Sequence, residues 1–162
     1  MTPTTRPVHD GLFGVDAAGA PFLVGGTCGE CARVQFPMAS TCPECGAANI
    51  AETRLPDHGT LWGWTAVTAP PPGYLGTVPF GFGVVELDGG LRVITRLEEP
   101  DPARLSFGMP MRLVIVELGP DPDREDDDED DPDAEDDDVV TTYSFTPDPS
   151  GAAEAGETGV SE

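Results

Sequence analysis

The sequence lacks lysine entirely. All eight basic residues are arginines, and they stand against 30 acidic residues among 162, for a net charge of −22. This surplus of negative charge disfavours binding to a nucleic-acid backbone or to an anionic membrane, because both require clustered positive charge. No apolar run approaches the roughly 20 residues of a membrane span, and no basic and apolar secretion signal follows Met1. We therefore expect a cytoplasmic protein with no nucleic-acid or membrane partner.

Cysteine is also scarce, but its four occurrences form a pattern. Cys28, Cys31, Cys42 and Cys45 have the spacing C-x2-C-x10-C-x2-C. Two facing C-x2-C turns can present four sulfurs at tetrahedral positions, which is the closed site that structural zinc prefers. We expect Gly46 and Gly29 to supply the positive φ angles that such turns need. The sequence therefore predicts a four-cysteine zinc site.

Three other interpretations of the cysteines compete with zinc. Two disulfides would suit a secreted protein, which the missing signal argues against. Redox chemistry of the C-x-x-C type needs a thioredoxin-like setting, and the sequence shows no βαβ pattern. Iron held as in rubredoxin would use the same sulfur geometry, so iron remains the less favoured alternative.

The rest of the chain predicts strands and almost no helix. Short segments at 22–24 and 34–36 flank the first cysteine pair and predict a ribbon hairpin. Five later segments are rich in β-branched and aromatic residues, at 60–68, 80–87, 91–97, 111–118 and 139–145. Five short strands favour a small barrel, and the OB-fold is the natural candidate. The predicted fold class is thus mostly β, with a zinc ribbon followed by a five-stranded OB-fold barrel.

Composition divides the chain into four parts. Residues 1–20 form a flexible leader, 21–55 the ribbon, 56–147 the barrel and 148–162 a disordered tail. Within the barrel, residues 121–138 hold fourteen acidic residues and one arginine. Such self-repelling sequence does not pack. We therefore expect a disordered acidic loop between the fourth and fifth barrel strands.

The sequence shows no convincing catalytic constellation. His9 and His58 lie outside the cysteine spacing, and no glycine-rich phosphate loop is present. A closed four-cysteine metal has no open position for water, and it leaves no free thiol for acyl transfer. We therefore expect the chain not to be an enzyme by itself.

Some barrel residues are candidates for a partner surface. Two tryptophans are predicted to share one strand face, two arginines share another, and the proline-rich loop 70–79 carries an aromatic and an apolar residue. Tryptophan and arginine often anchor interfaces, and long loops often carry binding. The candidate residues are Trp62, Trp64, Tyr74, Leu75, Phe80, Arg92 and Arg96.

The order of these landmarks resembles the DUF35 family, in which a rubredoxin-like zinc ribbon runs directly into an OB-fold. The resemblance covers roughly residues 21–147. Its landmarks are Cys28-x-x-Cys31, Phe36-Pro37, Cys42-Pro43-x-Cys45-Gly46, Gly59-Thr60-Leu61-Trp62, Pro79-Phe80, Gly108-Met109 and Phe145-Thr146-Pro147. The cysteine motif alone is generic, whereas the ordered set is more specific.

The resemblance implies a non-catalytic subunit that assembles with a thiolase-like or hotdog-fold acyl-CoA enzyme as a hetero-oligomer. It also implies that the subunit helps to form the site for the CoA thioester. This chain departs from many members in its short Gly/Pro-rich leader, where they carry a longer aromatic helix. Two alternatives remain open at this point: a nucleic-acid-binding zinc-ribbon OB module, and a rubredoxin-like iron electron carrier.

Overall fold

The computed structural model describes residues 5–120 and 139–150, and its regular elements are almost all strands. The described residues contain no α-helix, and no helix among them is long and apolar enough to cross a membrane. In chain order the elements are β1 (Thr5–Pro7), β2 (Phe13–Val15), β3 (Pro21–Cys28), β4 (Val34–Gln35), β5 (Ile50–Leu55), β6 (His58–Val67), β7 (Phe80–Leu87), β8 (Arg92–Leu97), the 3₁₀ turn η1 (Pro102–Arg104), β9 (Pro110–Pro120) and β10 (Val139–Pro147).

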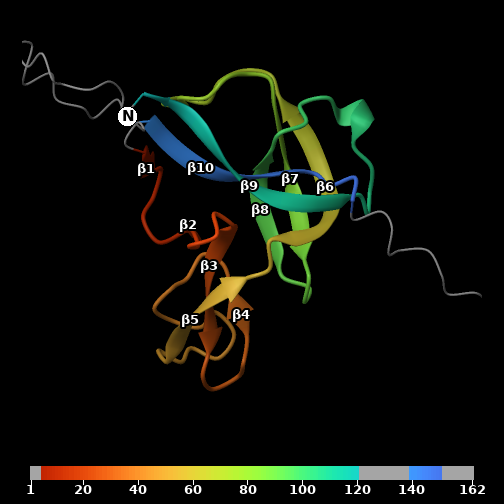
Figure 1. Cartoon of the computed structure of the whole chain (residues 1–162). Helices are drawn as coiled ribbons and strands as arrows, with labels where there is room; N and C mark the ends of the chain where they lie inside the picture. Colours follow the sequence, from red (N-terminus) through yellow and green to blue (C-terminus); the bar gives the residue numbers. More distant parts are fainter. Residues whose placement is uncertain (1–4, 121–138, 151–162) are drawn as a thin grey trace, which may run out of the picture.

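Strands β6 to β10 close into a five-stranded barrel, which lies above the ribbon in Figure 1. The strand order around the barrel is β6–β7–β8–β10–β9, and the pairing of Gly59 with Met111 returns it to β6. All neighbours are antiparallel except β8 and β10, which run parallel where Ser144 pairs with Arg96. This is the arrangement of an OB-fold, so the fold class predicted from the sequence is confirmed.

The ribbon is built around β3. Strand β5 pairs along one edge of β3, from Leu23 opposite Leu55 to Cys28 opposite Ile50. Along the other edge, β2 pairs with the beginning of β3 and β4 pairs with its end. Strand β3 therefore holds Cys28 at one end and Leu23, which belongs to the hydrophobic core, near the other.

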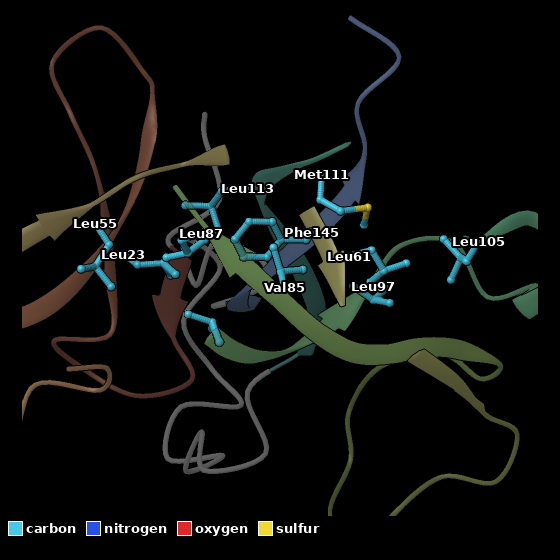
Figure 2. Packing of buried hydrophobic residues seen from close by; sticks show 11 residues of the cluster. Leu23, Leu55, Leu61, Val85, Leu87, Leu97, Leu105, Met111, Leu113 and Phe145 are labelled. Carbon is cyan, nitrogen blue, oxygen red and sulfur yellow. The ribbon is translucent and has the colours of Figure 1, made fainter. Parts of the chain in front are cut away.

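One hydrophobic core joins ribbon and barrel. Figure 2 shows Leu23 and Leu55 of the ribbon beside Leu87 of the barrel, with Leu113 and Phe145 next in the same cluster. All five side chains are buried. A ribbon of about 35 residues is too small to form a core of its own, so it completes its core with side chains of the barrel.

Aromatic rings add to this junction. Tyr143 of β10 meets Phe36 edge-on at 5.6 Å between ring centroids, and it meets Phe13 at 6.3 Å. Edge-to-face pairs of this kind add about 0.5–1.5 kcal/mol each beyond their burial. Burial also raises the pKa of Tyr143 above its usual value. The ribbon is thus held against the barrel on two elements, β2 and the segment after β4.

Residues 5–20 differ from the flexible leader predicted for 1–20. Strand β1 pairs in parallel with β10, from Thr5 opposite Val139 to Pro7 opposite Thr141, and β2 pairs with β3. The sequence gives little sign of these contacts, because each strand has only three residues and its partner lies elsewhere in the chain. Phe13 of β2 packs against the core instead of belonging to a flexible arm.

The predicted tail boundary at residue 148 also needs correction. Asp148 is buried, and its backbone N–H donates to Pro110 O at 2.9 Å. The barrel therefore extends at least one residue beyond the predicted end. The predicted disordered segments at 121–138 and 151–162 lie outside the described residues.

The shared core predicts that ribbon and barrel unfold together. Leu55→Ala should lower the free energy of unfolding by about 2–5 kcal/mol, as large-to-small core changes do. Circular dichroism and the accessibility of the cysteine thiols should then report one transition at the same denaturant concentration. Glu52→Ala, an exposed change in the same strand, serves as the control and should stay within about 0.5 kcal/mol. Two separate transitions would contradict a shared core.

Candidate metal centre

The two cysteine turns have the same backbone geometry. In each turn the amide four residues after the first cysteine donates to the carbonyl of that cysteine. Ala32 N lies 2.9 Å from Cys28 O, and Gly46 N lies 3.0 Å from Cys42 O. These bonds close two matching loops, one after β3 and one before β5, and each loop presents its two sulfurs toward the other.

Both loops place a residue in the left-handed region at that fourth position. Gly46 has φ 75°, which glycine adopts without strain, but Ala32 has φ 58°. The sequence prediction was right for Gly46 and wrong for Gly29, which has no positive φ. A side chain at position 29 would instead meet the end of the Asn49 side chain, which would have to move. Gly29 thus leaves room for Asn49 beside the first turn.

The four sulfurs converge on one point. All four Sγ atoms lie within 4.8 Å of one another, and the pairs Cys28–Cys45 and Cys31–Cys42 are each 3.6 Å apart. A disulfide would require about 2.05 Å between sulfurs. A tetrahedral zinc with Zn–S bonds of about 2.3 Å has S···S edges of about 3.8 Å. The arrangement fits a metal with four thiolate ligands and does not fit disulfides.

The pKa values of these thiols reflect their crowding. Backbone amides of Cys45 and Glu44 point at Cys42 Sγ and lower the pKa of Cys42 to about 7. An amide of Arg33 lowers the pKa of Cys31, but the thiol of Cys42, desolvation and the other two thiols outweigh it and raise that pKa to about 12. Four thiolates this close need a cation, which a divalent metal would supply.

The tryptophans do not share a strand face, contrary to the sequence prediction. The register of β6 against β7 slips by one residue between Leu61 and Gly63, so Trp62 sits in a β-bulge. Trp62 is 46% exposed, whereas Trp64 packs against the core, and its Nε1 donates to a carbonyl of η1 at 3.1 Å. The sequence prediction assumed strict alternation along the strand, so it did not include the bulge.

The loop before β7 folds back onto the barrel. Tyr74 lies over Phe80, with 4.7 Å between ring centroids, and its hydroxyl contacts the guanidinium of Arg96. Leu75 beside it is half-buried. Three of the predicted partner residues, Tyr74, Phe80 and Arg96, thus form one cluster, and the tyrosine is held in place by its own chain.

The two arginines of β8 lie on its outer face as predicted, and each has partners within the chain. Arg92 Nε donates to Glu86 at 2.8 Å, and its guanidinium lies 4.1 Å from the ring of Trp62. Arg96 Nε donates to Glu98 at 2.9 Å. Both cations are therefore oriented by neighbouring side chains.

Sequence reasoning missed two polar groups. Buried Ser144 donates to Glu98 at 2.8 Å, and Asp148 lies 3.4 Å from Nε2 of His58, whose Nδ1 contacts Asp57. Bonds from Ser150, foremost from its hydroxyl, lower the pKa of Asp148. The contacts of Ser144 with Glu98 and of Asp148 with His58 join residues tens of positions apart, so no local motif could reveal them.

A closed four-cysteine ribbon joined to a five-stranded OB barrel by one core defines the class of zinc-ribbon OB-fold proteins. Family models agree with this class. Residues 16–51 match the model "ChsH2, rubredoxin-like zinc ribbon domain", and residues 52–116 match "ChsH2, C-terminal OB-fold domain". A DUF35 domain-containing scaffold protein of Pyrococcus furiosus is 34% identical over 92 residues, which cover 57% of this chain and 67% of that protein. The chain belongs to the DUF35 family.

Other relatives carry the names of enzyme subunits. Benzoylsuccinyl-CoA thiolase subunit BbsA of Thauera aromatica is 31% identical over 91 residues, covering 56% of this chain and 62% of the relative. The 3-oxo-4,17-pregnadiene-20-carboxyl-CoA hydratase alpha subunit of Mycobacterium tuberculosis is 41% identical over 62 residues, covering 38% of this chain but only 19% of the longer relative.

A solved structure extends the likeness to three dimensions. A chain of the Ltp2-ChsH2(DUF35) aldolase superposes with a TM-score of 0.57 at 25% identity. The alignment covers 78% of this chain and 84% of that one. Ribbon and barrel therefore follow one another here as they do in this family.

The positive φ of Ala32 predicts that glycine at this position stabilises the protein. Ala32→Gly should stabilise the folded protein by about 1–2 kcal/mol, because it removes the strain of a left-handed alanine. The glycine should also cost about 0.4–1 kcal/mol, because it gives the unfolded chain more conformational freedom. The metal-loaded protein should gain about 0.5–1 kcal/mol in denaturant unfolding. Gly46→Ala, the matching change in the other turn, should instead destabilise the protein. A less stable Ala32→Gly variant would show that the positive φ carries no strain.

The sulfur geometry predicts one metal ion per chain. Elemental analysis of the purified protein should find one equivalent of zinc in a colourless sample, whereas iron would give visible absorbance. Chelation should unfold the ribbon, because metal binding contributes about 10–16 kcal/mol in zinc-finger peptides. Lowering the pH should release the metal, since protons compete for the thiolates. Disulfide-linked, metal-free protein would contradict this assignment.

Proposed function

We propose that this chain is a non-catalytic, zinc-containing subunit that assembles with a thiolase- or aldolase-like acyl-CoA enzyme and helps to form its CoA-thioester site. One observation carries the proposal: the ribbon and barrel together superpose on 84% of a chain from an aldolase whose name includes a DUF35 component. The relative named as a thiolase subunit supports the same role.

The chemistry of the described residues supports an accessory role. The four cysteines converge on one point, so a metal held there would engage every thiol of the chain. His58 is exposed between Asp57 and the buried Asp148, and it is not paired with a nucleophile among the described residues. A general base needs a partner and a pocket. The reacting groups would therefore belong to the partner enzyme.

We extend the proposal to the compartment of the protein. Four free thiols aligned for a metal suit a reducing environment, where disulfides are rare. We place the protein in the cytoplasm, where acyl-CoA enzymes would be available as partners. The net charge of −22 weighs against the alternative of a nucleic-acid-binding OB module, because phosphate backbones attract positive charge.

Purification of the tagged chain from its native host tests the proposal. We expect a thiolase-like enzyme to be retained in stoichiometric amount and identified by mass spectrometry. A hotdog-fold hydratase would redirect the proposal to that class of partner. The recovered complex should bind a CoA thioester at least about tenfold more tightly than the isolated chain. The tag alone serves as the control, and recovery of a lone monomer would contradict the proposal.

A further inference from the structure

The outer surface of β6, β7 and β8 is unusually apolar. Outward positions on a small barrel usually carry polar side chains, because they face water. Here they include Trp62, 46% exposed, Phe82, 41% exposed, and Ile94, 63% exposed. We call this surface the outer β6–β8 face and define it by Trp62, Phe82, Val84 and Ile94.

Strand pairing makes these residues neighbours. Val84 of β7 pairs directly with Ile94 of β8, and Phe82 lies two residues from Val84 on the same side of β7. Trp62 joins them from β6, where the bulge turns its ring outward beneath the guanidinium of Arg92. Side chains paired across strands lie about 5 Å apart. Phe82, Val84 and Ile94 therefore form one patch, and Trp62 borders it next to Arg92.

Among the described residues, one loop covers one end of this apolar row. Phe80 is the next outward residue of β7 before Phe82, and it is buried because Tyr74 lies over it. The hydroxyl of Tyr74 contacts Arg96, which fixes the loop at that end. Phe82 and Ile94 remain exposed beyond the loop, so the described residues leave the larger part of the face uncovered.

The charges bordering the face are paired and cancel. Arg92 binds Glu86 at 2.8 Å, and Arg96 binds Glu98 at 2.9 Å. A chain with a net charge of −22 thus presents one face with no net charge. Desolvating this face leaves no unpaired ion, and unpaired ions are what make interface burial costly.

The net charge of the chain indicates which kind of partner can bind the outer β6–β8 face. A second copy would bring a second charge of −22 to the interface, and such like-charged chains repel one another. A heterologous protein of neutral or basic net charge meets no such repulsion, and a basic one would be attracted. The complementary surface is therefore apolar at its centre and belongs to a partner that is not itself strongly acidic.

We infer that the outer β6–β8 face is the docking surface for the acyl-CoA enzyme, with Trp62, Phe82 and Ile94 inserted into an apolar partner surface. This inference rests on the proposed function, because it takes the occupant from it. Exposed aromatic residues next to an oriented arginine are the composition of interface hot spots. The patch also needs an apolar cover, since large exposed apolar faces are uncommon on isolated proteins.

Binding of the purified partner to surface variants tests the inference. The enzyme identified by co-purification is titrated against wild-type chain, Ile94→Arg and Phe107→Arg. Ile94→Arg places a charge on the most exposed apolar residue of the face and should weaken binding at least tenfold. Phe107, 72% exposed in the loop after η1, is the matched control, and its variant should bind within about threefold of wild type. Metal content and thermal midpoint show that each variant is folded.

The possible outcomes separate the two proposals. If the wild-type chain retains no acyl-CoA enzyme, the proposed function is wrong, and so is the inference that such an enzyme binds the outer β6–β8 face. If wild type and Ile94→Arg bind the enzyme equally, only the docking surface is wrong. A wild-type dimer that becomes a monomer on Ile94→Arg would assign the face to a second copy and overturn the inference. If Ile94→Arg does not fold, Phe82→Ser replaces it, with the same expected loss.

Discussion

The ribbon depends on neutralising four sulfurs that lie within 4.8 Å of one another. Backbone amides lower the pKa of Cys42, while neighbouring thiols raise that of Cys31. Four thiolates this close would repel one another, and a bound cation would neutralise them. The paired backbone bonds of the two turns position the sulfurs for that cation, and Ala32 accepts a left-handed conformation to do so. The backbone geometry of the two turns thus serves to bring the four sulfurs together.

The second constraint is the shared core. Leu23 and Leu55 of the ribbon pack into the barrel cluster around Phe145 rather than forming a separate core within the ribbon. The aromatic contacts of Phe13 and Phe36 with Tyr143 widen the junction. Ribbon and barrel are consequently packed on one core rather than joined as two modules on a linker.

The proposed function rests on the surface that this chain presents. The closed sulfur site has no position for a substrate, and the oriented arginines of β8 are paired with glutamates. The outer β6–β8 face is apolar and bordered by paired charges, and the proposed partner surface would complement it. This combination fits a family whose members bear the names of scaffold proteins and enzyme subunits.

The sequence by itself determined the cysteine site, the barrel strands and the acidic balance, because spacing, alternation and charge are local properties of the chain. Tertiary structure decided where the remaining residues act. The bulge separates Trp62 from Trp64, β1 and β2 find distant partners, and Asp148 is buried beside His58. Each of these depends on register between strands far apart in the chain. A one-residue shift in register turns a side chain to the opposite face, and no local pattern records it.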